Sequence, residues 1–313
     1  MQVRLAQLGD NWSARGSVAT LGNLDGVHRG HQAILSQARE RANQLGVPSV
    51  AVVFEPQPRE FFTPHQAPAR LTKFKEKILA LQPYVDGVQV LKFNSELASQ
   101  SPEQFVEHWL VGQLGIQHLV VGDDFRFGAK RAGDFALLER MGATHDFSVE
   151  RTRQVMHKGR RISSTWVREA LAGNELGLAE ALLGRPYSLQ GRVNHGLQLA
   201  RTLGFATANV QLSRKQVALR GVFAARATVA SLGIQDHPAV VNLGTRPSVA
   251  GRPLGLEVHL LDFEGDLYGH TMQVQFTHHL RDEQRFDGLE ALTEQIHRDH
   301  AMARDCLRLI KRT

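Results

Sequence analysis

The period of the apolar residues changes once along the chain, and this change limits the fold more than any other feature of the sequence. In the first half, the apolar runs SVATL (residues 17–21) and SVAVVF (residues 49–54) have the length and composition of strands. Between them, apolar residues recur at helical spacing at Ile34, Leu35, Ala38, Ala42 and Leu45. The order strand, helix, strand is typical of a parallel crossover unit.

The same alternation continues through the first half of the chain. Strand-like runs occupy residues 87–93, 118–122 and 147–155, and Ser101-Pro102 opens a helix-like segment over residues 102–113. Repeated strand and helix signals of this kind predict an α/β fold, with a mostly parallel sheet and helices on both faces.

After about residue 187 the helical spacing gives way to a two-residue alternation. This alternation occupies residues 222–230, 256–261 and 272–276, and it predicts an antiparallel barrel or sandwich. Helical spacing returns only in the last segment, at Leu289, Leu292, Ile296, Ala303 and Leu307. We therefore predict two domains, residues 1–186 and 187–313, with the boundary where Gly184-Arg185-Pro186 ends a helical stretch.

Composition limits the class of protein without selecting a function. The chain has 313 residues, of which 42% are apolar, and it contains no run of 18 apolar residues. The first residues, MQVRLAQLGD, lack the pattern of a secretion signal, so we expect a cytoplasmic protein with no membrane partner. The single cysteine, Cys306, excludes an intrachain disulfide and a cysteine-based zinc site. A net charge of +6 suits anionic ligands of several kinds.

The segment GNLDGVHRGH (residues 22–31) joins the first predicted strand of this unit to the following helix. Ligands of open parallel sheets bind at such a turn, and Gly22, Gly26 and Gly30 let the backbone turn sharply and approach a ligand. The helix start offers free N–H groups to a phosphate. His28 and His31 can both face that phosphate and stabilise charge on its non-bridging oxygens during phosphoryl or nucleotidyl transfer.

From the residues alone, two other phosphate-binding motifs are disfavoured and one alternative stays open. The segment lacks the Lys-Ser/Thr ending of a Walker loop and does not match GxGxxG, which disfavours a P-loop kinase or a dinucleotide site. It is also compatible with an ordinary exposed turn that happens to contain histidines.

A second candidate segment is GRRISSTWVREAL (residues 159–171). Ser163, Ser164 and Thr165 stand at a predicted helix start, and Arg168 follows one turn later on the same face. Hydroxyl groups and a guanidinium at a helix N-terminus suit the outer phosphates of a triphosphate. An ordinary helix cap with a surface arginine is the alternative.

Five segments in the first half together resemble the adenylyltransferase module of the bacterial bifunctional riboflavin kinase/FAD synthetases. They are GNLDGVHRGH, FEPQPREFF (54–62), ARLTKFKEK (69–77), VVGDDFRFG (120–128) and ISSTWVREAL (162–171). The resemblance implies a Rossmann-like nucleotidyltransferase fold with His28 and His31 as catalytic residues. It also implies an ATP and phosphate site made from Gly22, Asn23, Asp25, Gly30, Asp123, Ser163, Ser164, Thr165 and Arg168.

The second half resembles the riboflavin kinase module of the same proteins. The segments that carry this likeness lie at residues 191–210, 220–227, 240–248, 256–269 and 280–286. The resemblance implies a Greek-key barrel with a terminal helix, Glu257 as general base, and a metal and phosphate site at Thr207 and Asn209. Residues implied to bind ATP or flavin are Gly196, Arg201, Gly204, Asn242 and Arg281.

The chemistry of these residue types agrees with the implied roles. Thr207 and Asn209 are two apart on an extended segment, so both point the same way, and their oxygens suit Mg²⁺. Glu257 and His259 share one strand face while Val258 and Leu260 share the other, which leaves the carboxylate free to take a proton from an alcohol. Without the resemblance, Glu257 and His259 are equally compatible with the wet face of a strand.

The resemblance implies two reactions and four small-molecule partners: ATP, riboflavin, FMN and FAD. Mg²⁺ is expected in both reactions, nucleic acid is not an expected partner, and the oligomeric state stays open. Ala200 and Ala206 depart from the glycine and proline usual in the kinase module, and Leu24 and Gln57 from the phenylalanine and histidine usual in the first module. An adenylyltransferase with an impaired or altered kinase is therefore one alternative, and a non-enzymatic nucleotide-binding or RNA-binding protein is another.

Overall fold

The computed structural model describes residues 1–5, 12, 14–194, 207–214, 216–244 and 255–309. The chain forms two compact units, and each is described by itself. The first contains residues 1–68 and 72–164, and the second contains residues 69–71 and 165–313. The boundary after residue 186, which the sequence predicts between two functional domains, stays a prediction.

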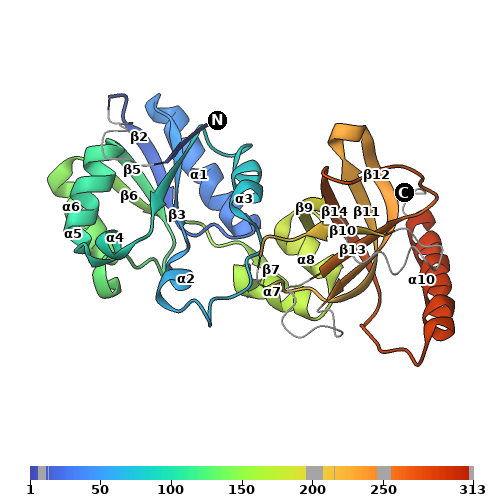
Figure 1. Cartoon of the computed structure of the whole chain (residues 1–313). Helices are drawn as coiled ribbons and strands as arrows, with labels where there is room; N and C mark the ends of the chain where they lie inside the picture. Colours follow the sequence, from blue (N-terminus) through green and yellow to red (C-terminus); the bar gives the residue numbers. More distant parts are fainter. Residues whose placement is uncertain (6–11, 13, 195–206, 215, 245–254, 310–313) are drawn as a thin grey trace. The chain divides into compact units, whose positions relative to one another are not determined.

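A six-stranded parallel sheet forms the centre of the first unit, with the strand order β1-β4-β3-β2-β5-β6 (Figure 1). The strands are β1 (Gln2–Leu5), β2 (Ser17–Leu21), β3 (Ser49–Glu55), β4 (Gly87–Lys92), β5 (Ile116–Val121) and β6 (Ser148–Arg151). The predicted parallel sheet is confirmed. Strand β1 was not predicted, because four residues at a sheet edge give too short a pattern to identify.

Helices cover both faces of this sheet, as the alternating pattern predicts. On one face, apolar residues of α1 (Arg29–Leu45) and of α3 (Phe74–Leu81) pack against Ala51 and Val53. On the other, α5 (Pro102–Phe105), the π-helix η1 (Val106–Gln113) and α6 (Phe135–His145) pack against Val50 and Val52. The shorter elements are α2 (Pro58–Phe62), α4 (Ser95–Ser99), the 3₁₀ turn η2 (Ala129–Arg131), β7 (Met156–His157) and β8 (Arg160–Arg161).

The strand order determines where a ligand can approach the first unit. Strand β2 pairs with β3 on one side and with β5 on the other. The strand order therefore reverses at β2. Such a switch point opens a crevice at the carboxyl ends of the two central strands. The segment at residues 22–31 follows β2 and therefore lies at this point.

The second unit is a closed, antiparallel six-stranded barrel with the order β10-β13-β12-β11-β14-β9. Its strands are β9 (Ser188–Asn194), β10 (Ala208–Gln211), β11 (Gly221–Val229), β12 (Ile234–Gly244), β13 (Gly255–Leu260) and β14 (Thr271–Arg281). Since β14 returns to lie beside β11, strands β11 to β14 form a Greek key. The unit also contains most of α7 (Ser164–Ala172), α8 (Leu176–Leu183) and the 3₁₀ turn η3 (Ala230–Leu232).

The terminal helix α10 (Leu289–Leu309) covers part of the outer surface of the barrel (Figure 1). Val222 and Val240 of the barrel form one buried apolar cluster with Ala303 and Leu307 of the helix. The predicted helix is confirmed, but Leu289 does not belong to its apolar face and is 66% exposed. Its position in the first turn, before the helix reaches this cluster, explains why spacing alone misplaced it.

A buried ion pair fixes α10 to the last barrel strand. Arg281 donates through Nε and Nη2 to the carboxylate of Asp299, at 2.8–3.1 Å, and Gln295 donates to the same carboxylate at 2.9 Å. Asp299 is 2% exposed, so these donors replace the water that the charge loses.

We expect Asp299→Ala to lower the free energy of unfolding by roughly 3–5 kcal/mol, because it leaves the Arg281 guanidinium without its carboxylate in a largely buried site. Chemical denaturation of the purified variant measures this. Asp305→Ala, which alters an exposed acidic residue of the same helix, is the control and should stay within about 0.5 kcal/mol of the wild type. Equal stability of the two variants would contradict the structural role of the ion pair.

Acid should destabilise the second unit through His300 of α10. His300 stacks on His259 with ring centroids 4.5 Å apart, and burial, followed by the charges of His259 and Arg304, lowers the pKa of His300 to about 4. The unfolded chain, with an ordinary pKa of 6.5, binds more protons between these two values, so unfolding is favoured as the pH falls. We expect the midpoint of thermal unfolding to fall less between pH 7 and about pH 5 in His300→Gln than in the wild type. The exposed His278 provides the control His278→Gln, whose pH dependence should match the wild type.

Candidate functional site

The turn after β2 has an unusual backbone for its residue types. Leu24 and Val27 adopt φ of 45° and 43°, in the left-handed region that β-branched and bulky residues avoid, and Gly26 adopts 84°. The side chains of Leu24 and Val27 are almost fully buried, which holds this conformation in place. Strained backbone of this kind is found where the surrounding structure over-determines it, often at ligand sites.

Asp25 connects the turn to a distant part of the first unit. Its carboxylate, 2% exposed, accepts hydrogen bonds from the backbone N–H of Thr72 at 3.0 Å and from the Thr72 hydroxyl at 3.2 Å. The N–H of Gly26 donates to the same hydroxyl at 3.0 Å. Asp25 therefore shapes the turn from within. Thr72 was not identified from the sequence, although it lies in the segment ARLTKFKEK, just before helix α3.

His28 and His31 come together at the first turn of α1, as the sequence predicts. His28 caps the helix, and its Nδ1 accepts a hydrogen bond from the His31 backbone N–H at 3.3 Å. The two imidazole rings stack, with centroids 3.6 Å apart and planes 19° from parallel. A pair of rings at a helix N-terminus combines side-chain N–H donors with the positive end of the helix dipole.

Close packing at the same place favours a glycine at position 30. A Cβ at this position would lie 3.1 Å from the His28 ring and 3.2 Å from the carbonyl oxygen of Ile162. The chain that leads to Ser163 therefore passes directly against the first turn of α1. Ser164, the first residue of α7, donates its hydroxyl to the carbonyl oxygen of Asp25 at 2.9 Å.

The remaining predicted residues of this site occupy different surroundings. Gly22 follows β2 directly, and Asn23 is exposed at the carboxyl edge of the sheet. Asp123 lies after β5, next in the sheet to β2, where Gln154 donates to it at 2.6 Å. Thr165 and Arg168 belong to the second unit, where the Arg168 Nε donates to the carbonyl oxygen of Ala69 at 2.6 Å.

An aromatic cluster at the same edge of the sheet was not assigned a role from the sequence. Phe61 and Phe62 of α2 are 39% and 62% exposed, and each meets the ring of Phe93 after β4, with centroids 5.5 and 5.6 Å apart. Two consecutive phenylalanines in a short helix after a strand were the signal available in the sequence. Their rings offer an apolar surface to a planar ligand.

In the barrel, four polar residues form a row across neighbouring strands. Asn194, Asn209, Glu257 and Asn242 are direct cross-strand partners on β9, β10, β13 and β12. Residues that oppose one another in an antiparallel pair lie on the same face. Because Ala208 and Val258 are buried inside the barrel, the row lies on its outer face, as predicted for Glu257.

The donor set of this row is compatible with a divalent cation. Asn209 lies directly opposite Glu257, and Thr207 lies two residues before Asn209. The Oδ1 atom of Asn242, beside Glu257 on the other side, is buried and has no hydrogen-bond partner among the described residues. A buried acceptor without a donor fits a bound cation or an N–H group of a ligand.

The structure describes only some of the other residues predicted for this site. Arg281 is engaged by Asp299 of α10, so part of its guanidinium already has a partner within the protein. Gly196, Arg201 and Gly204 lie outside the described residues, as do Ala200 and Ala206. The implied roles of these residues stay predictions.

Comparisons with known proteins identify two family models along the chain. A family model described as FAD synthetase matches residues 10–166, and one described as riboflavin kinase matches residues 183–307. The bifunctional riboflavin kinase/FMN adenylyltransferase of Pseudomonas fluorescens is 54% identical over 291 residues, which covers 93% of each chain. The protein of the same name from Escherichia coli K12 is 47% identical over 297 residues, covering 95% of this chain and 94% of its relative.

The architecture also matches a solved structure over almost its full length. A crystal structure described as a macrolide-efflux protein from Streptococcus pneumoniae covers 97% of this chain and 99% of its own, with a TM-score of 0.82 and 25% identity. Among the described residues of the present chain, no helix combines the length and the apolar character that crossing a bilayer requires.

Proposed function

The chain belongs to the family of bifunctional riboflavin kinase/FMN adenylyltransferases, and from this premise we propose which of its side chains carry out each reaction. The enzyme phosphorylates riboflavin with ATP to give FMN and ADP. It also transfers the adenylyl group of a second ATP to FMN, which gives FAD and pyrophosphate. The first reaction belongs to the barrel and the second to the unit built on the parallel sheet.

In adenylyl transfer, a phosphate oxygen of FMN attacks the α-phosphorus of ATP, and pyrophosphate leaves. The incoming phosphate is itself the nucleophile, so the protein has to align the two substrates and stabilise the charge that develops. We assign this stabilisation of charge to the stacked pair of His28 and His31 at the N-terminus of α1. Their N–H groups donate to the non-bridging oxygens of the α-phosphate as negative charge accumulates there.

The residues around the imidazoles divide into those that bind and those that shape the site. We assign the glycine-rich turn with Asn23 to the nucleotide and Ser163 to the outer phosphates, while the phosphate-binding roles that the resemblance implies for Thr165 and Arg168 stay predictions. Asp25, buried and bonded to Thr72, keeps the turn in its strained conformation. Ser164 holds the neighbouring chain against that turn through the Asp25 carbonyl.

The exposed aromatic cluster is suited to bind the planar flavin ring of FMN. Phe61, Phe62 and Phe93 lie after β3 and β4, at the same edge of the sheet as the histidine turn. Contact with these rings removes the apolar flavin surface from water. This leaves the ribityl phosphate free to approach ATP.

In the kinase reaction, Glu257 accepts the proton of the riboflavin 5′-hydroxyl as that oxygen attacks the γ-phosphorus of ATP, and ADP leaves. Thr207 and Asn209 would hold Mg²⁺, and Asn242 lies in the same polar row as Asn209. When bound, Mg²⁺ neutralises charge on the phosphates of ATP. Glu257 lies opposite Asn209, so the base and the metal-binding amide are adjacent on the barrel surface.

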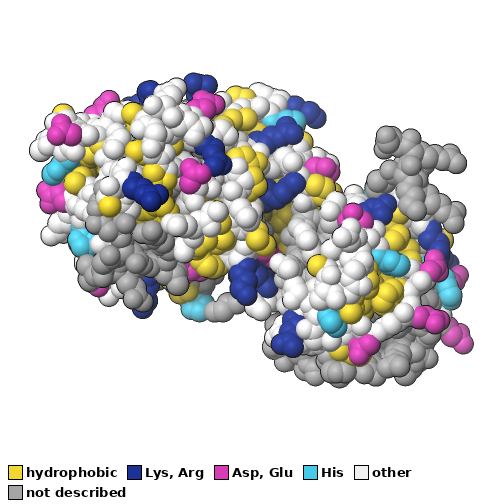
Figure 2. All heavy atoms as spheres, turned by 90° about the horizontal axis from the view of Figure 1, so that it is seen from above, with side chains coloured by type: hydrophobic (Ala, Val, Ile, Leu, Met, Phe, Trp, Pro, Cys, Tyr) yellow, Lys and Arg dark blue, Asp and Glu magenta, His cyan; other side chains and the backbone are white. Residues whose placement is uncertain are grey.

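The distribution of charge on the face drawn in Figure 2 is compatible with small anionic substrates. Figure 2 shows lysine and arginine side chains in several separate groups on the visible face, with acidic and apolar side chains between them. A nucleic-acid site more often gathers its basic side chains in one patch or stripe. The cytoplasm stays the predicted compartment.

We expect His31→Ala to lower the rate of FAD formation from FMN about 10²- to 10³-fold, because one donor to the charge of the transition state is lost. FMN formation from riboflavin by the same preparation should be unchanged. Chromatography of the flavins after incubation with ATP and Mg²⁺ measures both rates. The exposed His65 gives the control His65→Ala. A normal rate of FAD formation in His31→Ala would show that the adenylyl site is misplaced.

We expect the opposite pattern from Glu257→Gln, which keeps the shape of the side chain but cannot accept the proton. FMN formation should fall by about 10²- to 10⁴-fold, while FAD formation from supplied FMN continues at the wild-type rate. Glu264→Gln, at an exposed position of the same unit, is the matched control. Equal loss of both activities would contradict separate sites on the two units.

A further inference from the structure

The position of α1 determines where the imidazoles of His28 and His31 lie, since His28 caps this helix and His31 lies in its first turn. The buried face of this helix consists of Leu35, Ala38, Ala42 and one polar residue, Gln37. Gln37 is only 6% exposed. A buried amide destabilises a protein unless its groups are hydrogen-bonded, so its partners indicate what it contributes.

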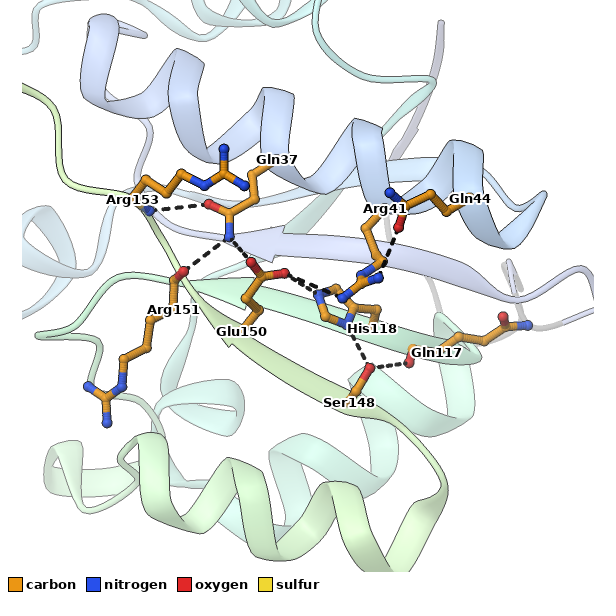
Figure 3. A network of polar contacts seen from close by, with 9 residues as sticks. All are labelled: Gln37, Arg41, Gln44, Gln117, His118, Ser148, Glu150, Arg151 and Arg153. Atoms are coloured by element: carbon orange, nitrogen blue, oxygen red, sulfur yellow. Dashed lines mark hydrogen bonds and ion pairs between the residues drawn. The ribbon is translucent and has the colours of Figure 1, made fainter.

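Gln37 binds the end of strand β6 through three hydrogen bonds (Figure 3). Its Nε2 donates to Glu150 Oε1 at 2.6 Å and to the carbonyl oxygen of Arg151 at 3.0 Å. Its Oε1 accepts from the backbone N–H of Arg153 at 3.2 Å. Both donors and one acceptor of the amide are thus used, which fixes the side chain in one orientation and joins the middle of α1 to the chain leaving β6.

The carboxylate that receives Gln37 is itself held in place. Glu150 Oε2 lies 3.2 Å from Nε2 of His118 and 4.0 Å from Arg41, and His118 Nδ1 lies 2.6 Å from the Ser148 hydroxyl (Figure 3). Burial, followed by the charge of Arg41, lowers the pKa of His118, while Glu150 opposes this shift. The neutral ring therefore donates through Nε2 to Glu150 and orients the carboxylate towards Gln37.

The chain leaving β6 leads directly to the adenylyl site. Gln154 donates to Asp123 at 2.6 Å, and the N–H of Ile162 donates to the carbonyl oxygen of Val155 at 3.0 Å. The carbonyl oxygen of Ile162 then faces Gly30. The chain that Gln37 binds at Arg151 and Arg153 therefore continues to Ser163, which we assign to the phosphates.

We infer that Gln37 is a positioning residue for adenylyl transfer, which sets the imidazoles of α1 against the segment leading to Ser163. This inference rests on the proposed role of His28 and His31. Gln37 contacts neither substrate; it acts through the helix and through the end of β6. Since a misplacement of about 1 Å can cost about 10²-fold in rate, loss of this connection should lower kcat more than it raises KM.

The experiment compares Gln37→Met with the wild type in the full-length enzyme, using FMN, ATP and Mg²⁺. Methionine has a similar length and no amide. We expect kcat for FAD formation to fall about 10- to 100-fold, with KM for ATP and FMN within about twofold and FMN formation from riboflavin unchanged. Gln44→Met is the matched control, because Gln44 lies on the same helix and its side chain has one hydrogen bond among the described residues, to the exposed Arg41 at 2.9 Å. Its kcat should equal that of the wild type.

A swap of the two partners tests whether the contact itself matters. Gln37→Glu alone places two carboxylates against each other and should lower kcat further. Adding Glu150→Gln restores one N–H···O bond between the positions, and we expect it to recover at least about tenfold of the lost kcat. A merely structural role would not produce this recovery in kcat without a matching recovery of thermal stability.

The outcomes separate this inference from the proposed site. If His31→Ala loses FAD formation but Gln37→Met keeps kcat within about twofold of the wild type, the positioning role is wrong and the site stands. If Gln37→Met lowers both activities together with thermal stability, Gln37 serves the fold alone and the inference is overturned. If His31→Ala is fully active, the site is misplaced and the inference fails with it.

Discussion

The proposed adenylyl site depends on the hydrogen bonds of one buried residue, Asp25. Thr72 donates to its side chain and Ser164 to its carbonyl oxygen, so one residue joins three segments that are far apart in the sequence. These bonds hold the left-handed backbone of Leu24 and Val27, which the residue types alone disfavour. A turn held this firmly can present its N–H groups to a phosphate without rearranging when the ligand binds.

The barrel reaches a comparable arrangement by strand register. Its inward positions are apolar along each strand, so the alternate positions must face outward, and the pairing of β10, β13 and β12 sets Asn209, Glu257 and Asn242 side by side. Helix α10 covers the apolar part of the same outer surface through Val222 and Val240. The helix and the polar row thus share one face of the barrel, with Arg281 and Asp299 fixing the helix to it.

Features that depend on local pattern were predicted well from the sequence. The spacing of apolar residues identified the parallel sheet, the barrel and the terminal helix, and the order of strand and helix signals correctly placed His28 and His31 at a helix start after β2. The sequence did not identify the structural roles of Thr72, Gln37 and Asp299. These roles depend on partners that are distant in the sequence or lie on another element. No periodicity indicates that Gln37 meets Arg153, or that residues 69–71 join the second compact unit.

The cap that begins α1 also restricts the chemistry of His28. Its Nδ1 accepts the N–H of His31, so the lone pair of that nitrogen is occupied and the neutral ring carries its proton on Nε2. His28 can therefore offer a single donor, in one direction. A phosphate that His28 binds must therefore approach the Nε2 edge of the ring.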